Sequence, residues 1–407
     1  MFENYFASEN SLKNLYMISN SKLASITNQL GKLASVDDFA GYDPYDALNS
    51  AFVRSSSFGL KYGRIAWTQL LRRLHINIRP FIGIKRGHNA KALGLFLSGY
   101  AKLNFMSPND DYSSQIVRLM HLLEVNKSKN YSGYCWGYNF DWQSRAFFIP
   151  KYTPTIVNSS FVGHALLDLH KYTGNQEALN MAVSIKDFIL KDLNRTIDGN
   201  TFCFSYTPID NTGVHNANLL GASLLIRLFY VLGDESLRTA ALESLAYSMK
   251  YQHEDGSWFY AESSIQRWID SYHTGFNLHA IRIFLKLNEA DEFRHAYKKG
   301  VDFYSDNFFL SDGTPKYYHN KIHPIDIHSP AQAISFFSEE GNHHKNLTEN
   351  VLNWTIENML SSKGHFYFRK GRIFTNKISY IRWSQAWMFH ALTDYQFNNS
   401  INKTPNL

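Results

Sequence analysis

The sequence predicts an all-α fold, an (α/α)6 toroid in which six helical hairpins close into a ring. Two observations predict this fold: similar apolar segments recur about every 56 residues, and amphipathic segments alternate with them. A recurring unit that cannot bury its own apolar face has to stack on its neighbours. Six stacked units can close on themselves, and a closed ring places equivalent positions around one central cavity.

The recurring segments are the predicted inner helices of the ring. Each opens with a small polar residue or His and continues with apolar and small residues at helical spacing. They are apolar on nearly all sides, as in NLLGASLLIRLFYVLG, and a helix of that kind is buried. The six segments begin at Asn89, Asn158, Asn216, His273, His328 and Ser384.

The segments between them are the predicted outer helices, because each combines an apolar stripe with a charged face, as in NQEALNMAVSIKDFILKDL. They cover 60–75, 110–125, 175–192, 235–252, 289–307 and 343–360. We therefore expect one toroid over residues 60–396, with an N-terminal extension over residues 1–59 and a C-terminal tail over residues 397–407.

The connections that lead from an outer to an inner helix are long, whereas the return connections are short. The long ones start near a Gly turn and alternate aromatic with polar residues, as in DGSWFYAESSIQRWID, which is typical of short β-hairpins. All of them precede the N-terminus of an inner helix, so they gather on one face of the ring. Long loops in a compact domain are usually functional, so this face is the predicted working face.

Composition excludes several classes of function. The formal net charge is +6, but no basic stripe of the kind that binds nucleic acid is present. An anionic or neutral oligosaccharide or polysaccharide is the expected partner, since aromatic residues make up 15% of the chain and those in loops can stack on sugars. We expect no metal and no cofactor, because no tight pair of His ligands occurs on one helix face. The sequence does not indicate an oligomeric state.

The chain is expected to be cytoplasmic. No basic segment followed by an apolar stretch opens the sequence, so we expect no secretory signal. No apolar run approaches the roughly 18 residues of a membrane span. The two cysteines, Cys135 and Cys203, form no metal-binding spacing and are expected to be reduced thiols.

Two Asp/His pairs at equivalent ring positions are the predicted catalytic residues. They are Asp270 with His273 and Asp326 with His328. A His near neutral pH can take up and return a proton, and a nearby Asp can fix its tautomer. The two Asp could also flank a glycosidic bond as acid and base. The alternative is that the Asp residues only cap helices, which Asp does well, whereas His is a poor cap.

Further residues are predicted to bind substrate, by hydrogen bonding from the inner-helix entries, by stacking from the loops, or by pairing Arg382 with a carboxylate. Asn89, Asn158, Asn216 and Ser384 are as readily explained as helix caps. The predicted binding residues are His88, Asn89, Trp136, Tyr138, Asp141, Trp142, Arg145, Asn158, Asn216, Trp268, Arg382 and Trp383.

In this arrangement the chain resembles the six-hairpin toroid enzymes of carbohydrate metabolism, over roughly residues 60–396. That group includes glycoside hydrolases, polysaccharide lyases that act on uronates, and sugar epimerases. More narrowly, the stretches GYDPYDALNS, IRPFIGIKRGHNAKALGLFL and WIDSYHTGF resemble a bacterial family found with surface-polysaccharide biosynthesis genes. This narrower resemblance transfers no catalytic residue. One stretch, QHEDGSW over residues 252–258, looks like a repeat motif of terpene cyclases, which are also α/α toroids.

The sequence therefore predicts a carbohydrate-active enzyme that uses Asp/His acid-base catalysis on a bacterial surface polysaccharide or its precursor. Hydrolysis, β-elimination and epimerisation of a glycan, including a uronate-containing one, all stay open. A terpenoid-cyclase-like enzyme and a non-catalytic glycan-binding scaffold are the alternatives.

Overall fold

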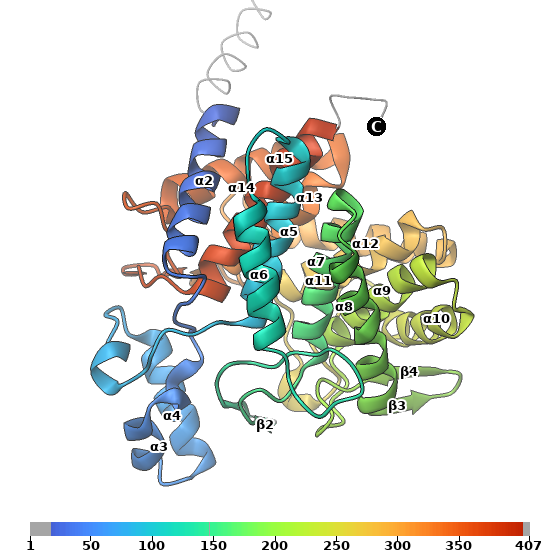
Figure 1. The fold of residues 1–407 in the computed structure, drawn as a ribbon, viewed down its shortest axis with the longest axis horizontal. Coiled ribbons are helices and arrows are strands. Elements are labelled where there is room, and N and C mark those ends of the chain that lie inside the picture. The colour runs from blue at the N-terminus through green and yellow to red at the C-terminus, as the bar shows by residue number, and fades with distance from the viewer. Residues whose placement is uncertain (1–17, 146, 402–407) are drawn as a thin grey trace, which may run out of the picture.

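The computed structural model describes residues 18–145 and 147–401, and it confirms the predicted toroid (Figure 1). Each inner helix packs against the next, and the last packs against the first, which closes the ring. The first turn of the last inner helix is a π-helical turn, η7 (Ile381–Ala386). The inner helices are α5 (Ala90–Met106), α7 (Ile156–Thr173), α9 (His215–Leu232), α11 (Ser271–Lys286), α13 (His328–Ser338) and α15 (Trp387–Ile401).

Six outer helices surround the inner ones. Five of them lie where the sequence predicts, and α8 ends in a π-helical turn, η3 (Phe188–Asp192). The outer helices are α2 (Asn20–Val36), α6 (Ser113–Val125), α8 (Gln176–Asp187), α10 (Glu235–Lys250), α12 (Arg294–Phe308) and α14 (Lys345–Met359).

The sixth outer helix is α2, and the prediction that residues 60–75 supply it was wrong. The predicted helix forms as α4 (Lys61–Arg73), but it packs on η1 (Asp46–Asn49) and α3 (Ala51–Ser56) instead of on the ring. The reason is apolar area, since α4 buries only Thr68 and Leu71. By contrast α2 buries an apolar stripe at helical spacing against α15, made by Leu23, Ile26, Leu30 and Ala34. The boundary at residue 60 stays a prediction, and residues 1–17 and 402–407 lie outside the described part of the chain.

The two ends of the ring differ as predicted. One end, the link face, carries short connections, and Gly174 and Gly233 end α7 and α9 there with φ values of 71° and 70° that favour glycine. The other end, the loop face, carries the long connections and every strand. These strands are β1 (Trp142–Gln143), β2 (Phe148–Ile149), β3 (Arg195–Asp198), β4 (Thr201–Phe204), β5 (Ile325–Asp326), β6 (Arg369–Lys370) and β7 (Thr375–Asn376).

The strands pair in two ways. β1 pairs with β2 and β3 with β4 inside single loops, while β5 pairs with β6 and so joins two successive loops. Short 3-10 turns complete the connections. They are η2 (Arg79–Ile82), η4 (Ser264–Gln266), η5 (Asp291–Phe293) and η6 (Gly341–His344).

The longest connection, residues 37–89, covers part of the loop face. Figure 1 shows its helices α3 and α4 beside the end of the ring that carries β2, β3 and β4. A buried ion pair between Arg382 of η7 and Asp43, at 2.6 Å, ties it to the ring. A second buried pair, Arg79 with Asp46 at 2.7 Å, lies within the connection itself. No helix in the described residues is long and apolar enough to cross a membrane.

Candidate functional site

Three aromatic side chains form a floor across the inside of the ring. Phe161, Phe276 and Trp387 come from three inner helices, and their ring centroids lie 5.2–5.4 Å apart. On one side of this floor lies a cavity of about 460 Å³, the loop-face chamber, lined by the N-terminal ends of inner helices and by the long loops. On the other side lies a cavity of about 610 Å³, the link-face chamber, lined further along the same helices. Among the described residues, Phe276 alone lines both.

The loop-face chamber is rich in cations and aromatic rings. Its described lining residues contain no Asp and no Glu, although both predicted catalytic Asp come from nearby elements. The only histidines on its wall, among those residues, are His273 and His328. The cationic residues of the lining are Arg72, Arg73, Lys91, Arg145 and Arg382.

His273 is held by Asp270, the N-cap of α11. One oxygen of Asp270 accepts the backbone N–H of His273 at 3.0 Å, and the other accepts from the imidazole Nδ1 at 2.7 Å. Trp268 donates its indole N–H to the same carboxylate at 2.9 Å. Because a carboxylate accepts hydrogen bonds only, Nδ1 carries a proton and Nε2 keeps its lone pair. Asp270 therefore caps α11, and the same carboxylate fixes the orientation of the His273 imidazole.

His328 is buried, with 1% of its surface exposed, and neither ring nitrogen has a hydrogen-bond partner among the described residues. Its ring centroid lies 4.6 Å from those of Tyr272, Trp383 and Trp387. Burial lowers its pKa well below the ordinary value, and Lys91, Arg382 and His273 lower it further. His328 is therefore a neutral imidazole that can exchange a proton with a bound molecule.

Tyr272 joins the two histidines. Its ring centroid is 4.2 Å from that of His273 and 4.6 Å from that of His328. The centroids of the two imidazoles can therefore be no farther apart than these two distances added together. They come from the adjacent helices α11 and α13 and line the same chamber. Two proton-transfer groups at this separation can reach one small substrate.

Asp326 does not line the loop-face chamber. It is fully buried and accepts from Arg369 at 2.6 Å, from the indole N–H of Trp383 at 2.7 Å and from the backbone N–H of His328 at 3.1 Å. Both oxygens of Asp326 therefore already have hydrogen-bond partners. One of these bonds holds the indole of Trp383, whose ring lies edge-on to His328. Asp270 does not line the chamber either, so the two Asp do not flank a common bond as an acid and base pair.

Arg382 lines the chamber, but its bidentate edge is already occupied. Nε and Nη2 donate to the two oxygens of Asp43 at 2.6 and 2.8 Å. The two N–H groups that were expected to bind a substrate carboxylate therefore bind Asp43 instead. Arg382 remains a cation at the chamber wall, packed over Tyr138 and Trp383.

Lys91 is a residue that the sequence analysis did not single out. It is 4% exposed, and its Nζ lies 3.9 Å from the ring centroid of Phe161, 4.8 Å from that of Phe276 and 5.0 Å from that of Trp387. Burial, and after it Arg382, lowers its pKa well below the ordinary value, while the three ring faces favour the cation. The signal was present in the sequence, since Lys91 and Lys102 interrupt an otherwise apolar inner helix.

The aromatic walls include most of the predicted stacking residues. Tyr138, Trp142, Trp268 and Trp383 line the chamber, and Trp268 stacks on Tyr260 with centroids 4.5 Å apart. Trp136 does not, because it is buried in the core and donates to the carbonyl of Leu123. Because Trp136 has no exposed ring face, it cannot stack on a sugar in this structure as expected.

The remaining predicted binding residues are divided between chamber and scaffold. Arg145 and Asn216 line the chamber. Asn89 is the N-cap of α5, as its alternative explanation states. Asn158 is fully buried and is not a cap, because Thr155 caps α7. His88 bonds to Asp38, and Asp141 accepts from the backbone of Lys151, so neither lies on the chamber wall.

The connection over residues 37–89 supplies chamber residues that sequence reasoning missed. Tyr45 and Arg72 both line the chamber, and the guanidinium of Arg72 lies 5.1 Å above the ring of Tyr45. A signal for Tyr45 was present in the stretch GYDPYDALNS, which is dense in Tyr and Asp. Among the described residues no group of three or more His, Cys, Asp or Glu is arranged to hold a metal. Cys135 and Cys203 are free and buried.

The stretch that looks like a terpene-cyclase repeat is structural here. Gln252 donates to the carbonyls of Gly256 and Ala296, and Trp258 donates to that of Ser248, which ties the end of α10 to α12. Asp255 accepts from Ser257 within its own turn. The stretch does not line the loop-face chamber.

Comparison with solved structures shows that the fold of the ring is shared with several known proteins. It is similar to a cellobiose 2-epimerase from Spirochaeta thermophila, with 12% identity and a TM-score of 0.59 over 77% of this chain and 87% of that chain. A family 76 α-mannanase from Bacteroides thetaiotaomicron gives 15% identity and a TM-score of 0.59 over 77% and 88%. A D-mannose isomerase gives 11% and 0.55 over 77% and 87%. No protein-family model and no curated protein matches the sequence. At these identities the similarity establishes the fold.

Proposed function

We propose that the protein is a sugar epimerase or isomerase that moves a proton at the carbon next to a carbonyl group. The observation that carries this proposal is the pairing of His273 and His328 in a chamber whose described lining has no carboxylate. A glycosidase of the usual kind needs two carboxyl groups at the scissile bond, and a terpenoid cyclase needs an acidic cluster. Proton abstraction next to a carbonyl needs instead a positioned base, which an imidazole supplies, and a positive environment for the oxygen.

In the proposed reaction the two imidazoles share the proton transfers. Nε2 of His273, left basic by the Asp270 hydrogen bond, takes the proton from the substrate carbon. The carbonyl oxygen gains negative charge, which the cations at the chamber wall, Lys91 and Arg382 among them, stabilise. His328 then passes its ring N–H proton to the other face of the same carbon for epimerisation, or to the neighbouring carbon for isomerisation. Its other nitrogen takes up a proton from solvent in the same step, and His273 releases to solvent the proton that it took.

A second candidate is β-elimination on a uronate. It starts with the same proton abstraction, next to a carboxylate, and it is favoured by the excess of positive charge over the chamber wall. The narrower proposal for either reaction is a sugar of a surface polysaccharide or its precursor. This rests on the sequence resemblance of the stretches 41–50, 78–97 and 268–276. The cytoplasmic location stays a prediction with it.

Solvent-proton exchange tests the proposal. The purified protein is incubated in D2O with cellobiose, with D-mannose and with uronate oligosaccharides, and three signals are followed. Deuterium at the carbon next to the carbonyl reports epimerisation or isomerisation, ultraviolet absorbance of an unsaturated uronate reports elimination, and new reducing ends report hydrolysis. Deuterium uptake lost in His273→Ala and His328→Ala supports the proposal. New reducing ends without deuterium uptake contradict it, and binding without any of the three signals favours the glycan-binding scaffold.

A further inference from the structure

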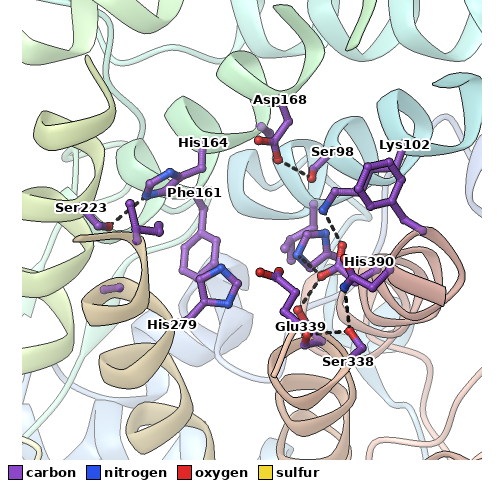
Figure 2. A pocket seen from close by; sticks show the side chains of 18 of the residues that line it. Ser98, Lys102, Phe161, His164, Asp168, Ser223, His279, Ser338, Glu339 and His390 are labelled. Atoms are coloured by element: carbon purple, nitrogen blue, oxygen red, sulfur yellow. Dashed lines mark hydrogen bonds and ion pairs between the residues drawn. The ribbon is translucent and has the colours of Figure 1, made fainter. Parts of the chain in front are cut away.

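The link-face chamber is the larger of the two cavities in the ring. Its volume of about 610 Å³ lies within the roughly 300–1,000 Å³ of small-molecule sites. Figure 2 shows side chains from several inner helices arranged around it, with His164 and His279 facing Glu339 and His390 across the cavity. Lys171 and Lys286 stand exposed at its rim.

The carboxylates on its described wall are all ion-paired. Asp168 pairs with Arg227 at 2.8 Å, Asp394 pairs with Lys102, and Glu339 pairs with Lys286 at 2.9 Å. Arg282 adds a second partner for Glu339, also at 2.9 Å. Because these charges neutralise one another, a charged ligand would have to break an existing pair, and breaking a buried pair is costly.

Three imidazoles on the wall are neutral. Burial lowers the pKa of His164 to about 3, with Arg227 contributing, and burial likewise lowers the pKa values of His279 and His390. His164 is engaged at both nitrogens, by Ser223 at 3.1 Å and by Arg227 at 2.9 Å. His279 and His390, by contrast, can each still form a hydrogen bond with a ligand.

Several neutral polar atoms on this wall lack partners. Nδ1 of His390 and Nε2 of Gln332 have none among the described residues, and Gln332 is 2% exposed. His279 has one long contact at Nδ1, to Arg282 at 3.4 Å. The inner end of the chamber is the aromatic floor, whose rings Phe161, Phe276 and Trp387 all line it. Flat apolar faces beside neutral hydrogen-bonding groups are the features that hold sugar rings.

We propose that the link-face chamber is a second binding site, for a neutral hydroxyl-rich molecule of monosaccharide to disaccharide size. A hydroxyl group donates and accepts, so it satisfies the imidazoles of His279 and His390 and the amide of Gln332 whichever tautomer is present. Among the described lining residues the buried cations are all paired, and the cation without an acidic partner, Lys171, stands at the exposed rim. The site is separate from the reaction proposed at the loop face, since the aromatic floor lies between them.

Histidine-selective NMR tests this site in the full-length protein. With 15N-labelled histidine side chains, His279 and His390 are assigned from the signals lost in His279→Phe and His390→Phe. D-glucose and cellobiose are the neutral probes, and D-glucuronate and inorganic phosphate are the anionic ones. The neutral sugars are expected to shift the His279 and His390 signals in a saturable manner, whereas the two anions leave them unchanged.

Two variants make the outcome decisive. In His273→Ala the shifts of His279 and His390 persist, because that substitution lies on the other side of the floor. In Gln332→Leu the sugar binds about tenfold more weakly, the loss of roughly one hydrogen bond. Absence of any shift with the neutral sugars overturns the proposal, as does a larger response to the anions or the loss of the shifts in His273→Ala. The experiment measures binding at His279 and His390 and not proton transfer. If the neutral sugars do not bind there, the proton-transfer proposal still stands. If no proton transfer is found at the loop face, the proposal of a second binding site still stands.

Discussion

His273 and His279 lie on the same helix, six residues apart, with Phe276 of the aromatic floor between them. One imidazole faces the loop-face chamber and the other the link-face chamber. His273 has a carboxylate on one nitrogen and, on the chamber wall around it, cations without an acid. His279 contacts an arginine at one ring nitrogen. The carboxylates on the chamber wall near it are already paired with cations. The comparison shows that charge pairing around an imidazole, rather than the residue type, decides what that imidazole can do.

The difference between the chambers follows from the connections. At the loop face the long connections bring Tyr45 and Arg72 from outside the ring, so positive charge accumulates without acids. At the link face the connections are short, and nearly all the chamber lining comes from inner helices packed against one another. Charges buried there need partners on neighbouring helices, such as Lys102 with Asp394. This contrast supports the two proposals, proton transfer at the loop face and ligand binding at the link face.

The largest effect is expected from removing either histidine of the loop-face chamber. His273→Ala and His328→Ala should each lower the rate of deuterium uptake by about 10²- to 10⁴-fold, the usual contribution of a positioned acid or base. The matched substitution His279→Ala on the same helix should leave that rate within about threefold of the unchanged protein. Isotope exchange at saturating sugar measures all three. Equal losses in His273→Ala and His279→Ala would mean that the two chambers do not differ in chemistry.

The next effect concerns stability at the link face. Asp394→Leu leaves Lys102 buried without its partner and should cost about 3–5 kcal/mol of the free energy of unfolding. Replacing both, as Lys102→Met with Asp394→Leu, should restore most of the loss. Arg145→Ala, an exposed cation of the loop-face chamber, is the control and should change the free energy by less than about 0.5 kcal/mol. Urea unfolding compares the three, and an equal cost for Arg145→Ala contradicts the contrast between paired and unpaired charges.

The ring itself could be predicted from the sequence because the inner helices repeat one physical requirement. Each has to be apolar on nearly all sides, so the pattern recurs at a nearly constant spacing and marks five of the six outer partners as well. The sixth, α2, could not be predicted, because it precedes the first inner helix by a connection of more than fifty residues that contains a competing helix, α4. Periodicity shows that a helix is amphipathic, but not against which helix its apolar face packs.

The site was predicted in part for a similar reason. The position of His273 and His328 in the repeat places them at the chamber mouth, since equivalent positions in a ring converge. Whether a side chain is free could not be predicted in that way. Asp326 and Arg382 occupy such positions too, but Arg369 and Asp43, from distant parts of the chain, already bind them. Lys91 was missed because the lysines that interrupt its apolar helix indicate a buried charge, but not that this charge lies at the chamber wall.

Acidification should weaken the fold through the buried imidazoles of both chambers. The pKa values of His164, His279, His328 and His390 are lower in the folded chain than in the unfolded one, so below about pH 6.5 the unfolded chain binds more protons. Stability is therefore fully present above that pH and is lost as the pH falls, by up to about 1.4 kcal/mol per pH unit for each histidine. Asp168 and Glu339, whose pKa values are lowered by their cationic neighbours, contribute only at lower pH.

Urea midpoints between about pH 7 and pH 5 measure this loss. His279→Gln should flatten the pH dependence by the share of one histidine, and His328→Gln should do the same from the other chamber. The lysine control Lys286→Met, at the exposed rim, should leave the slope unchanged in this range. A midpoint that stays constant down to pH 5 would show that these imidazoles are not held neutral.

The smallest effects separate the two Asp residues that the sequence treats as equivalent. Asp270→Asn removes a charged hydrogen bond to His273, of the kind worth about 1.5–3 kcal/mol, and an Asn amide can also select the wrong tautomer. The rate of deuterium uptake should fall about 10- to 100-fold with little change in KM. Asp326→Asn touches no imidazole nitrogen and acts only through the indole of Trp383 and the start of α13. Its expected effect is about threefold or less on the rate, together with a loss of stability, since Arg369 loses its partner. If Asp326→Asn lowers the rate as much as Asp270→Asn while the fold stays equally stable, Asp326 takes part in the proton transfer, and the loop-face chamber works with a carboxylate after all.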